Sequence, residues 1–403
     1  MEQVLYKLPD GWEWHSVKKL SHNIQYGHTA KAESNGNAKF LRITDIQDGK
    51  IDWQGVPTVS LEEKEISKYA LNDDDLIFAR SGATAGKSIL IKNAPKDAVF
   101  ASYLIRIVPN KKDIIPEYLS YFFLTPAYWE VVGQNAAGAA QPNINGTKLS
   151  EFIVPVAPQG EQKRIVEKLD ALLTRIDTAI EHLQQSVTLA DALYASTINE
   201  QMMQAIELAG LSTVEKHIEQ IQTGTTPPTK QPEFYENGDI NWFAPSDFGD
   251  HDILFDSNKK LSQKAFDAGK ARKFDAGTIM LVAIGATIGK IGYLEQDASS
   301  NQQITGMKFN SAIIPRYAYY WFRFIKPEIL TNASTATLPI INQKGIKALS
   351  FCAPNKQLQE TICRKIDEVS NFRNKVKAEL NEKVELMRSL KASILDSAFK
   401  GEL

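Results

Sequence analysis

The most constraining feature of this 403-residue chain is a long heptad-like stretch that occurs twice. Within residues 161–203, apolar residues recur alternately four and three positions apart, a spacing that keeps one stripe of a helix facing a partner helix. The same register returns 197 positions later without a gap. We therefore predict two long coiled-coil helices of matched length as the framework of the molecule. The predicted seam positions are Ile165, Leu169, Leu172, Ile176, Ala179, Leu183, Ala190 and Leu193 in the first helix, and Ile362, Ile366, Val369, Val376, Leu380, Met387, Leu390 and Ile394 in the second.

Polar residues interrupt this seam near the middle of each helix, at Ser186, Arg373 and Lys383. Polar seam residues usually fix the register of a coiled coil or face an external partner, at some cost in stability. Long heptad helices can also simply fill the core of a bundle, and the sequence leaves that alternative open. At the rise of an α-helix, residues 165–203 would span roughly 57 Å, enough to act as a ruler between two modules.

The repeat extends into the segments between the helices. Residues 24–27 return at 221–224, and the glycine-bounded segment at 82–87 returns at 285–290. The offset is 197 for the first pair and 203 for the second, whereas it is constant within the helices. Such a pattern is typical of two related modules with variable loops and a spacer of fixed length.

Each globular half is predicted to be mixed α/β. Short apolar runs bounded by polar turns predict strands, and a proline followed by aromatic residues at helical spacing predicts a buried helix. A stretch rich in Gly, Ala and Asn predicts a functional loop. The predicted segments are strands over 40–43, 75–79, 88–91, 104–108, 152–156 and 278–282, helices over 116–124 and 315–324, and loops over 133–147 and 332–343.

These patterns together predict an α/β mixed (α+β) fold, in which two similar globular domains are separated by two long coiled-coil helices. The predicted boundaries are residues 1–158 for the first domain and 159–208 for the first helix. The second domain is predicted over 209–355 and the second helix over 356–403.

Composition and charge narrow the possible classes of protein. The chain is 43% hydrophobic and 23% charged, which is ordinary for a soluble protein. It shows no signal peptide and no apolar run long enough for a bilayer, so we expect a cytoplasmic protein without membrane contact. The two globular segments carry net charges of −1 and +1, so neither is a basic module of the usual nucleic-acid kind. Cys352 and Cys363 are expected to be buried thiols.

The segment at residues 82–88 resembles a phosphate loop, but its first glycine is one residue too close to the Gly-Lys-Ser end. The second copy ends in Lys290 and Ile291 and lacks the hydroxyl that would bind magnesium. A glycine turn between two strands is the simpler interpretation. A further interpretation stays open, in which backbone N–H groups together with Lys87 or Lys290 bind a nucleic-acid phosphate.

The sequence contains no recognisable catalytic constellation. Its six histidines have neither metal-ligand spacing nor a repeat pattern. There is no nucleophile elbow and no glycine-rich dinucleotide turn. We therefore predict a non-catalytic binding protein with no metal site.

Several motifs resemble the specificity subunits of type I restriction-modification systems, and together they cover nearly the whole chain. The Leu-Pro-x-Gly-Trp motif at residues 8–12 is similar to the opening of that family, and residues 43–51 resemble a strand-turn of its first domain. Residues 155–165 look like the start of its first spacer helix, and residues 393–403 resemble the end of its second. The second copy departs from the pattern at residues 357–360, where the Glu-Gln pair is lost.

This resemblance implies that each globular half is a target recognition domain for one half of a bipartite double-stranded DNA sequence. It also implies that the spacer helices pack antiparallel, which gives the chain a pseudo-two-fold internal repeat. Two modification subunits, which use S-adenosylmethionine, would dock on this frame and methylate adenine. Restriction subunits would add translocation and cleavage driven by ATP and Mg²⁺. The chain itself would bind no cofactor and have no activity alone.

Polar loops of both halves offer groups suited to base edges and phosphates. Because the halves differ most in these loops, we expect two unlike half-sites. The near-zero net charge predicts weak DNA binding by the isolated chain. A scaffold whose repeated modules bind protein rather than DNA is the alternative. The candidate DNA-binding residues are Tyr26, His28, Lys31, Arg80, Ser81, Thr84, Lys87, Gln134, Gln141, Asn143 and Asn145 in the first half, and Thr225, Lys230, Thr287, Lys290, Gln302, Gln303, Thr335 and Asn342 in the second.

Overall fold

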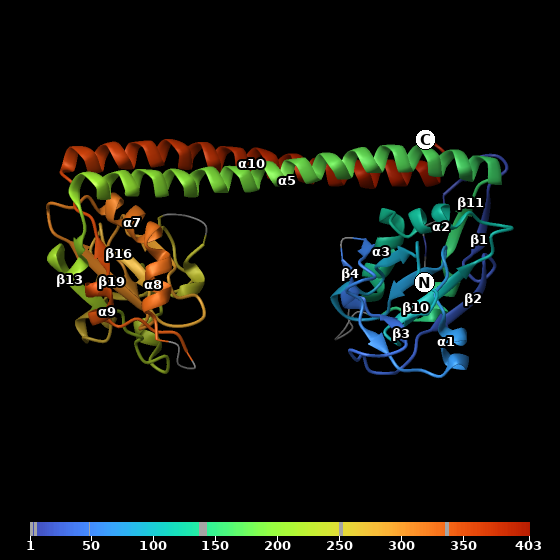
Figure 1. Cartoon of the computed structure of the whole chain (residues 1–403), viewed down its shortest axis with the longest axis horizontal. Coiled ribbons are helices and arrows are strands. Elements are labelled where there is room, and N and C mark those ends of the chain that lie inside the picture. The colour runs from blue at the N-terminus through green and yellow to red at the C-terminus, as the bar shows by residue number, and fades with distance from the viewer. Residues whose placement is uncertain (1–2, 4–5, 48, 137–142, 250–252, 335–337) are drawn as a thin grey trace. The chain divides into compact units, whose positions relative to one another are not determined.

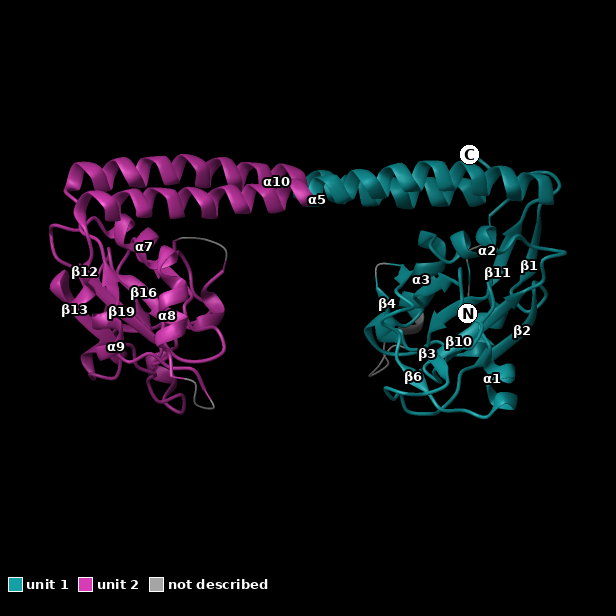
Figure 2. Ribbon diagram, in the orientation of Figure 1, with its two compact units in different colours: residues 1–184, 381–403 teal, residues 185–380 magenta. Residues whose placement is uncertain are grey.

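The computed structural model describes the chain except for residues 1–2, 4–5, 48, 137–142, 250–252 and 335–337, and the side chains of residues 135 and 136. The described residues form two compact units (Figure 2), of which one comprises residues 1–184 with 381–403 and the other residues 185–380. Each unit contains a globular module and a part of each long helix, α5 (Gln159–Ala209) and α10 (Lys356–Lys400) (Figure 1).

The module of the first unit is built on an antiparallel four-stranded sheet with the strand order β2-β10-β7-β8. A smaller sheet has the order β6-β3-β9, in which β3 is parallel to β9. Two further pairs are β1 with β11 and β4 with β5. The strands are β1 (Glu13–Ser16), β2 (Ser21–Tyr26), β3 (Ala38–Leu41), β4 (Ile46–Gln47), β5 (Lys50–Ile51), β6 (Thr58–Val59), β7 (Leu76–Ala79), β8 (Ser88–Leu90), β9 (Ala98–Phe100), β10 (Leu104–Pro109) and β11 (Ile153–Val156), and the helices are α1 (Glu63–Tyr69), α2 (Pro116–Phe122), α3 (Pro126–Ala136) and α4 (Gly146–Glu151).

The second unit repeats this topology. Its main sheet has the order β13-β19-β16-β17, its smaller sheet the order β15-β14-β18 with β14 parallel to β18, and β12 pairs with β20. The predicted internal repeat is therefore confirmed in both sheets and in the pair β1–β11, whereas the pair β4–β5 has no counterpart among the described residues of the second unit. The strands are β12 (Ser212–Thr213), β13 (Ile218–Thr223), β14 (Ile240–Phe243), β15 (Lys260–Leu261), β16 (Ile279–Val282), β17 (Ile291–Tyr293), β18 (Ser299–Ser300), β19 (Ile304–Phe309) and β20 (Ser350–Phe351), and the helices are α6 (Gln263–Asp267), α7 (Pro315–Phe324), α8 (Lys326–Asn332) and α9 (Gln343–Ala348).

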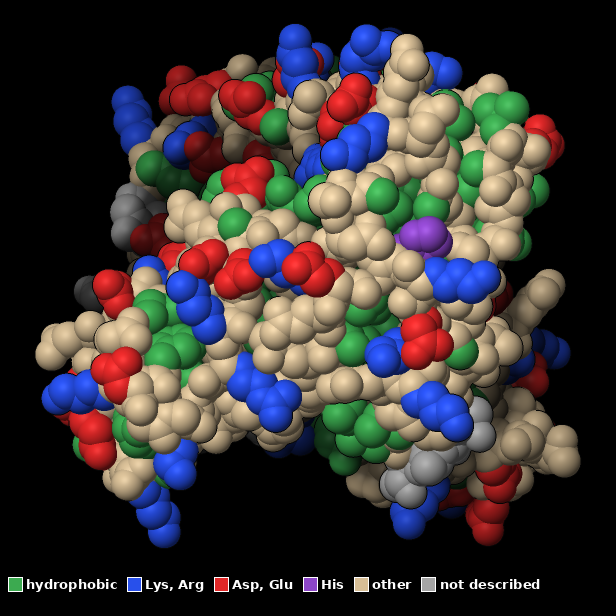
Figure 3. Space-filling model, turned by 90° about the vertical axis from the view of Figure 1, so that its left-hand side faces the viewer, with side chains coloured by type: hydrophobic (Ala, Val, Ile, Leu, Met, Phe, Trp, Pro, Cys, Tyr) green, Lys and Arg blue, Asp and Glu red, His purple; other side chains and the backbone are tan. Residues whose placement is uncertain are grey.

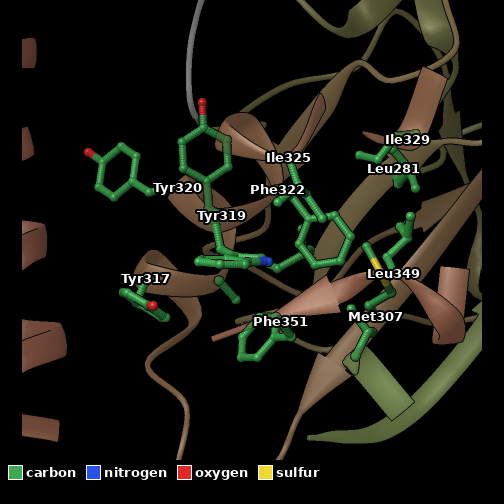
Figure 4. Packing of buried hydrophobic residues seen from close by; sticks show 14 of the residues in the cluster. Leu281, Met307, Tyr317, Tyr319, Tyr320, Phe322, Ile325, Ile329, Leu349 and Phe351 are labelled. Carbon is green, nitrogen blue, oxygen red and sulfur yellow. The ribbon is translucent and has the colours of Figure 1, made fainter. Parts of the chain in front are cut away.

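The core of each unit joins its module to the long helices. In the second unit, α7 is buried around almost its whole circumference, because it packs against the sheet strands β16 and β19 and against the long helices. Figure 4 shows its aromatic rings together with Leu281 and Met307 of the sheet. Its rings pack in one cluster with Leu281 and Met307 of the sheet and with Ile198 and Ile366 of the long helices. Burying an aromatic or aliphatic side chain contributes on the order of 1.5–3 kcal/mol, so this contact fixes the module on the helices.

A buried glutamine joins each module to the start of its long helix. The Oε1 atom of Gln162 accepts a 2.8 Å hydrogen bond from the N–H of Ile115, and its Nε2 donates 2.8 Å to the carbonyl of Ala157. Gln359, which lies 197 positions later, accepts 2.8 Å from Ile314 N and donates 2.7 Å to the carbonyl of Pro354. The sequence suggested that the second helix start loses the whole Glu-Gln pair, but it keeps the glutamine as Gln359 and lacks only the glutamate.

A tyrosine–aspartate contact ties the first helix after the sheet to the long helix in both units. Tyr121 of α2 donates its hydroxyl hydrogen to Asp170 of α5, and Tyr320 of α7 donates to Asp367 of α10. Burial, followed by the neighbouring aspartate, raises the pKa of both tyrosines, so both stay protonated as donors. The two pairs stand at related positions of the repeat, which explains why these residue types recur in the sequence.

The two long helices lie antiparallel. In the first unit Asp177 accepts from Lys391 at 2.7 Å, while Arg164 donates 2.9 Å to the carbonyl of Leu403. The higher residue numbers of α10 therefore lie beside the lower numbers of α5. In the second unit, Lys377 Nζ of α10 lies 3.3 Å from Asp191 of α5, so the two helices run in opposite directions there as well.

The predicted seam is wrong at some positions. Leu173 and Tyr194 are 4% and 2% exposed, whereas Leu193 is 48% exposed and the predicted Leu172 is only partly buried. Near the module the helix must bury a face wide enough for both its partner helix and the module, so the buried residues follow a spacing of four, four and three. Of the predicted polar seam residues Arg373 is buried, and Ser186 and Lys383 are exposed, as is Leu390. The buried runs are Ile165, Leu169, Leu173 and Ile176 in the first unit and Tyr194, Ile198, Met202 and Ala205 in the second.

Two further expectations are settled by the structure. The loop predicted over residues 133–147 is too long, since α3 continues to Ala136 and α4 begins at Gly146. Cys352 and Cys363 are buried and do not form a disulfide. Burial raises the pKa of Cys363 to about 12, so this thiol is protonated at neutral pH and unreactive, as predicted.

We predict that Gln359→Leu lowers the free energy of unfolding by about 2–4 kcal/mol, because the leucine leaves the N–H of Ile314 and the carbonyl of Pro354 without partners. Gln357→Leu, on the exposed side of the same helix turn, is the matched control and should change stability by less than about 0.5 kcal/mol. Urea denaturation of the full chain measures both. Equal effects of the two variants would show that the buried glutamine does not hold the module.

Candidate nucleic-acid interface

The glycine turn between β7 and β8 is held rigidly in the first unit. Gly82 and Gly86 have φ angles of +79° and +87°, a region that favours glycine. The carbonyl of Gly86 accepts a 2.7 Å hydrogen bond from the buried hydroxyl of Tyr128, and a Cβ atom at Gly86 would lie 2.9 Å from Val132. The predicted turn between two strands is confirmed, and helix α3 fixes its position.

A second segment lies alongside the end of β7. The N–H of Ile144 donates 2.8 Å to the carbonyl of Arg80, and Asn143 forms an isolated β-bridge with Ser81. Next to it, Asn145 caps α4 by accepting a 2.8 Å hydrogen bond from Lys148 N. The fold therefore brings together four of the predicted residues from two distant parts of the sequence, and the Asn145 side chain has an internal role there.

Two exposed aromatic rings neighbour Arg80. The guanidinium carbon of Arg80 lies 5.2 Å from the ring centroid of Tyr26, and the Tyr26 hydroxyl accepts a 2.8 Å hydrogen bond from Gly146 N. The N–H of Arg80 donates 3.0 Å to the carbonyl of Tyr103, whose side chain is 65% exposed. A guanidinium beside an exposed aromatic ring can contact a phosphate or a guanine edge while the ring packs on a sugar or a base.

Tyr103 was not predicted from the sequence. It lies outside every motif, in the turn before β10. Its position beside Arg80 follows from the antiparallel register of β10 with β7, in which Leu104 pairs with Ala79. The sequence shows Tyr103 only as an aromatic residue next to the end of a strand. Its link with Arg80 becomes visible only through the strand register.

The other first-unit candidates differ in how free their side chains are. His28 has both ring nitrogens engaged, since Nε2 lies 3.3 Å from Glu65 and Nδ1 accepts from Ala30 N at 3.0 Å. Its side chain therefore holds the loop after β2. Thr84 ends the short 3-10 turn and is partly buried. Lys31, Lys87 and Gln134 are exposed, and Gln141 lies outside the described residues.

The second unit repeats the arrangement of turn and neighbouring segment. Gly285 and Gly289 have φ angles of +109° and +84°. The N–H of Ile341 donates 3.0 Å to the carbonyl of Ala283, and Ile284 forms a bridge with Ile340. The same backbone arrangement, a glycine turn with a neighbouring segment, therefore supports the surface of each unit, although the side chains on it differ.

Several second-unit candidates hydrogen-bond within their own unit. Thr225 Oγ1 donates 3.0 Å to the carbonyl of Lys270, and Gln303 Oε1 accepts 3.0 Å from Asn301. Gln302 accepts from the hydroxyl of Thr226. These contacts shape the surface, and an external ligand would have to compete with them.

The remaining second-unit candidates do not form one group. Asn342 caps α9 by accepting 2.8 Å from Gly345 N. Lys290 donates 2.8 Å to the carbonyl of Phe248 and lines a cavity beside the long helices. Thr287 and Lys230 are exposed, and Thr335 lies outside the described residues.

Equivalent positions of the two frames carry different chemistry. The strand pairings match β2 with β13, β7 with β16 and β10 with β19. At the ends of these strands the first unit presents aromatic and cationic groups, whereas the second presents small or neutral polar groups. The matched pairs are Tyr26 with Thr223, Arg80 with Ala283 and Tyr103 with Gln303.

Charges of both signs are interspersed over the face of the molecule seen in Figure 3, and no broad basic patch covers it. Among the residues that the structure describes, no three His, Cys, Asp or Glu side chains are grouped as a metal site would require. Within the same residues, no helix combines the length and apolar character needed to cross a membrane.

The fold and its two unlike surfaces define a protein with two recognition modules mounted on a shared pair of antiparallel helices. The protein family described as "Type I restriction modification DNA specificity domain" matches residues 9–189 and again residues 216–386. The chain therefore belongs to the type I restriction-modification DNA specificity family. The two matched domains support DNA recognition as the role of the globular modules, and they do not support the protein-binding scaffold.

Curated relatives and solved structures agree with this family. The chain is 24% identical to the type I restriction enzyme StySPI specificity subunit of Salmonella potsdam, over 98% of this chain and 90% of the relative. It is 22% identical to the EcoKI specificity subunit of Escherichia coli K12, over 98% and 90%. A solved structure of a type I restriction-modification system shares the fold with a TM-score of 0.73 at 17% identity, covering 99% of this chain and 100% of that one. The HsdS subunit of Thermoanaerobacter tengcongensis gives a TM-score of 0.51 at 18% identity, with both chains fully covered.

We predict that Arg80→Ala relaxes the base preference in one half of the DNA target. Loss of a guanidinium–base contact costs about 1–3 kcal/mol, so discrimination at one or two positions should fall roughly tenfold. Selection from a random duplex library, with the complex that contains this chain, measures the preference at every position.

Lys112→Ala is the control for this variant, because Lys112 is an exposed lysine whose carbonyl faces the start of α5. It should leave the selected sequence unchanged. An unchanged preference with Arg80→Ala, in a complex that still binds DNA, would remove Arg80 from the interface.

Proposed function

We propose that this chain is the DNA-recognition subunit of a type I restriction-modification complex, and that each module contacts one half of a bipartite target. The observation that carries this proposal is the repeated frame with unlike side chains at equivalent positions. A repeated frame supports the same docking geometry on two DNA segments, as dimeric DNA-binding proteins use. Unlike side chains support two different half-sites, since base edges are distinguished by their donors and acceptors.

The long helices would set the gap between the half-sites. Helix α5 is continuous over 51 residues and passes from the first unit into the second. A helix of that length is stiff compared with a loop, and its length changes by about 1.5 Å for each residue added. The gap would therefore be a property of the helix length and not of the modules.

The long helices would also dock the modification subunits. Leu189 and Leu193 lie on one face of α5 and are 69% and 48% exposed, and Leu386 and Leu390 on α10 are 62% and 48% exposed. The second pair follows the first by 197 positions, so it is the repeat-related copy. Exposed leucines four residues apart on a helix are typical of a surface that packs against a partner helix.

Two repeat-related apolar surfaces, one in each unit, suit two copies of the same partner. The modification subunits would then supply S-adenosylmethionine chemistry, and restriction subunits would supply ATP- and Mg²⁺-dependent translocation and cleavage. This chain, with a net charge of −2, would contribute base recognition while its partners contribute much of the electrostatic attraction to phosphates.

We predict that a matched insertion of seven residues in both helices, after residues 184 and 380, lengthens the gap of the target while both half-sites stay unchanged. Seven residues preserve the heptad phase and add about 10 Å, which corresponds to roughly three base pairs. Methylome sequencing of cells that express the complex gives the modified motif directly. A longer helix pair with an unchanged gap would contradict the proposed role of the helices.

We also predict that Leu189→Glu and Leu386→Glu each remove one modification subunit from the purified complex, and that the double variant removes both. A carboxylate at either position would have to be buried without a counter-charge in the interface. Gln204→Glu adds the same charge elsewhere on α5 and should keep the full complement. Native mass spectrometry counts the subunits, and an unchanged count in the double variant would exclude these surfaces.

A further inference from the structure

An arginine outside every predicted motif reaches the recognition surface of the second unit. Arg272 is exposed and lies in the segment between α6 and β16. Its Nη1 donates a 2.8 Å hydrogen bond to the carbonyl of Thr223, the residue that corresponds to Tyr26 at the end of β2. Within the described part of the chain, the other N–H groups of this guanidinium have no partner. The second surface therefore has a cation at the end of β13, although Ala283 stands where the first has Arg80.

The backbone that carries Arg272 is fixed in place. Three side chains donate hydrogen bonds of 2.7–3.0 Å to carbonyl groups of residues 270–273, and buried Phe274 anchors the next position. A segment that is already ordered loses little conformational entropy when its side chains bind a ligand. The three bonds run from Thr225 Oγ1 to Lys270, from Ser299 Oγ to Arg272 and from Gln222 Nε2 to Lys273.

A glutamine contacts the same strand end. Gln343 is the first residue of α9, and its Nε2 donates a 3.0 Å hydrogen bond to Thr223 Oγ1. This bond uses one of the two amide hydrogens. The second hydrogen and Oε1 have no partner among the residues that the structure describes. The amide is therefore held in one orientation with a donor and an acceptor available, at the residue that Arg272 also contacts.

The internal repeat shows that the frame does not require this glutamine. At the offset of 197, the counterparts of Gln343 and Thr223 are Gly146 and Tyr26. The N–H of Gly146 donates 2.8 Å to the Tyr26 hydroxyl, and a Cβ atom at Gly146 would lie 3.5 Å from the tyrosine ring. A large ring beside a glycine in one unit is thus matched by a small threonine beside a glutamine in the other. The exchange keeps a hydrogen bond at this place and replaces a ring by an amide.

The repeat gives the same result for Arg272. Its counterpart is Tyr69, at the offset of 203 that also relates the glycine turns. The register agrees, since the N–H groups two residues later, of Leu71 and Phe274, each donate 2.8 Å to the carbonyl of an equivalent alanine. Tyr69 is partly buried, with its ring 5.1 Å from that of His28, whereas Arg272 is exposed. An inward-packed ring satisfies this position, so the exposed arginine serves another purpose.

We propose that Arg272 and Gln343 read bases of the second half-site, Gln343 an adenine and Arg272 a guanine. This proposal rests on the proposed function, because it assigns bases to the half-site that the second module contacts. The free acceptor and donor of the amide match the N6–H and N7 groups of adenine, and two donors of the guanidinium match O6 and N7 of guanine. All four atoms lie at the major-groove edge, where the base pairs are distinguishable.

Selection from a random duplex library, with the complex that contains this chain, tests the role of Gln343. The wild-type complex should specify an A·T pair and a G·C pair in its second half-site. Gln343→Ala should lower the preference for one adenine there roughly tenfold, which corresponds to about 1.4 kcal/mol. Gln343→Glu keeps the shape but has only acceptors, which suit the N4 amino group of cytosine, so cytosine should replace adenine at that position. A residue that only held the frame would not exchange one preferred base for another.

The same selection tests Arg272. Arg272→Ala should lower the preference for one guanine of the second half-site roughly tenfold. Arg272→Lys keeps the charge but loses the planar fork, so it should weaken that preference while overall affinity changes less than about twofold. Gln357→Glu and Arg364→Ala make matched changes at exposed positions of α10 and should leave the selected sequence unchanged.

The outcomes separate this proposal from the proposed function. A uniform loss of affinity with Arg272→Ala, without a change in base preference, would make Arg272 a phosphate contact and overturn its assignment. An unchanged second half with Gln343→Glu, in a complex that native mass spectrometry shows to be intact, would overturn that of the glutamine. In both cases a first half that still responds to Arg80→Ala leaves the proposed function standing. A wild-type complex that selects no bipartite sequence would contradict the proposed function itself.

Discussion

The attachment of each module to its long helix is the constraint on which the rest of the structure depends. A buried glutamine at the start of the helix, Gln162 or Gln359, satisfies backbone groups of the loop that leads into α2 or α7. A tyrosine–aspartate contact follows about two turns later. The glutamine side chains are buried, so breaking their hydrogen bonds leaves unpaired donors and acceptors in a core. Each module is therefore fixed in orientation on its part of the helix pair, and a recognition surface on it has a defined direction.

Because of the internal repeat, both modules are attached to the long helices in the same way. Their recognition surfaces can nevertheless differ. The strand order, the glycine turn and the neighbouring segment recur in both units, whereas the side chains at the strand ends do not. Arg80 with Tyr26 offers a cation beside an aromatic ring, and Ala283 at the equivalent of Arg80 offers no charge. In the first unit Tyr26 and Tyr103 are exposed and Arg80 is only partly buried, so these side chains can change with little effect on the core.

Much of this architecture could be predicted from the sequence, because periodicity and repetition are local signals. The long helices, their common offset of 197 and the glycine turns were all accessible in that way. The exact seam was not, since the heptad pattern does not show that the helix also packs on its own module, which replaces Leu172 by Leu173 and Leu193 by Tyr194 in the buried face.

The site was harder to predict than the fold. A polar residue in a loop can bind a ligand or cap a helix, and the sequence does not distinguish these roles. Asn145 and Asn342 cap helices, and Lys290 lies in a cavity beside the long helices. Tyr103 became a candidate only through its strand register. That cavity combines residues from five separate parts of the chain, which no local pattern could have joined.

Exchange of residues 1–158 for the corresponding module of another family member, followed by methylome sequencing, tests the central claim most directly. Independent modules on a shared helix pair predict that one half of the modified sequence changes, while the other half and the gap stay as they were. A hybrid that is assembled and active but alters both halves, or neither, would contradict the account.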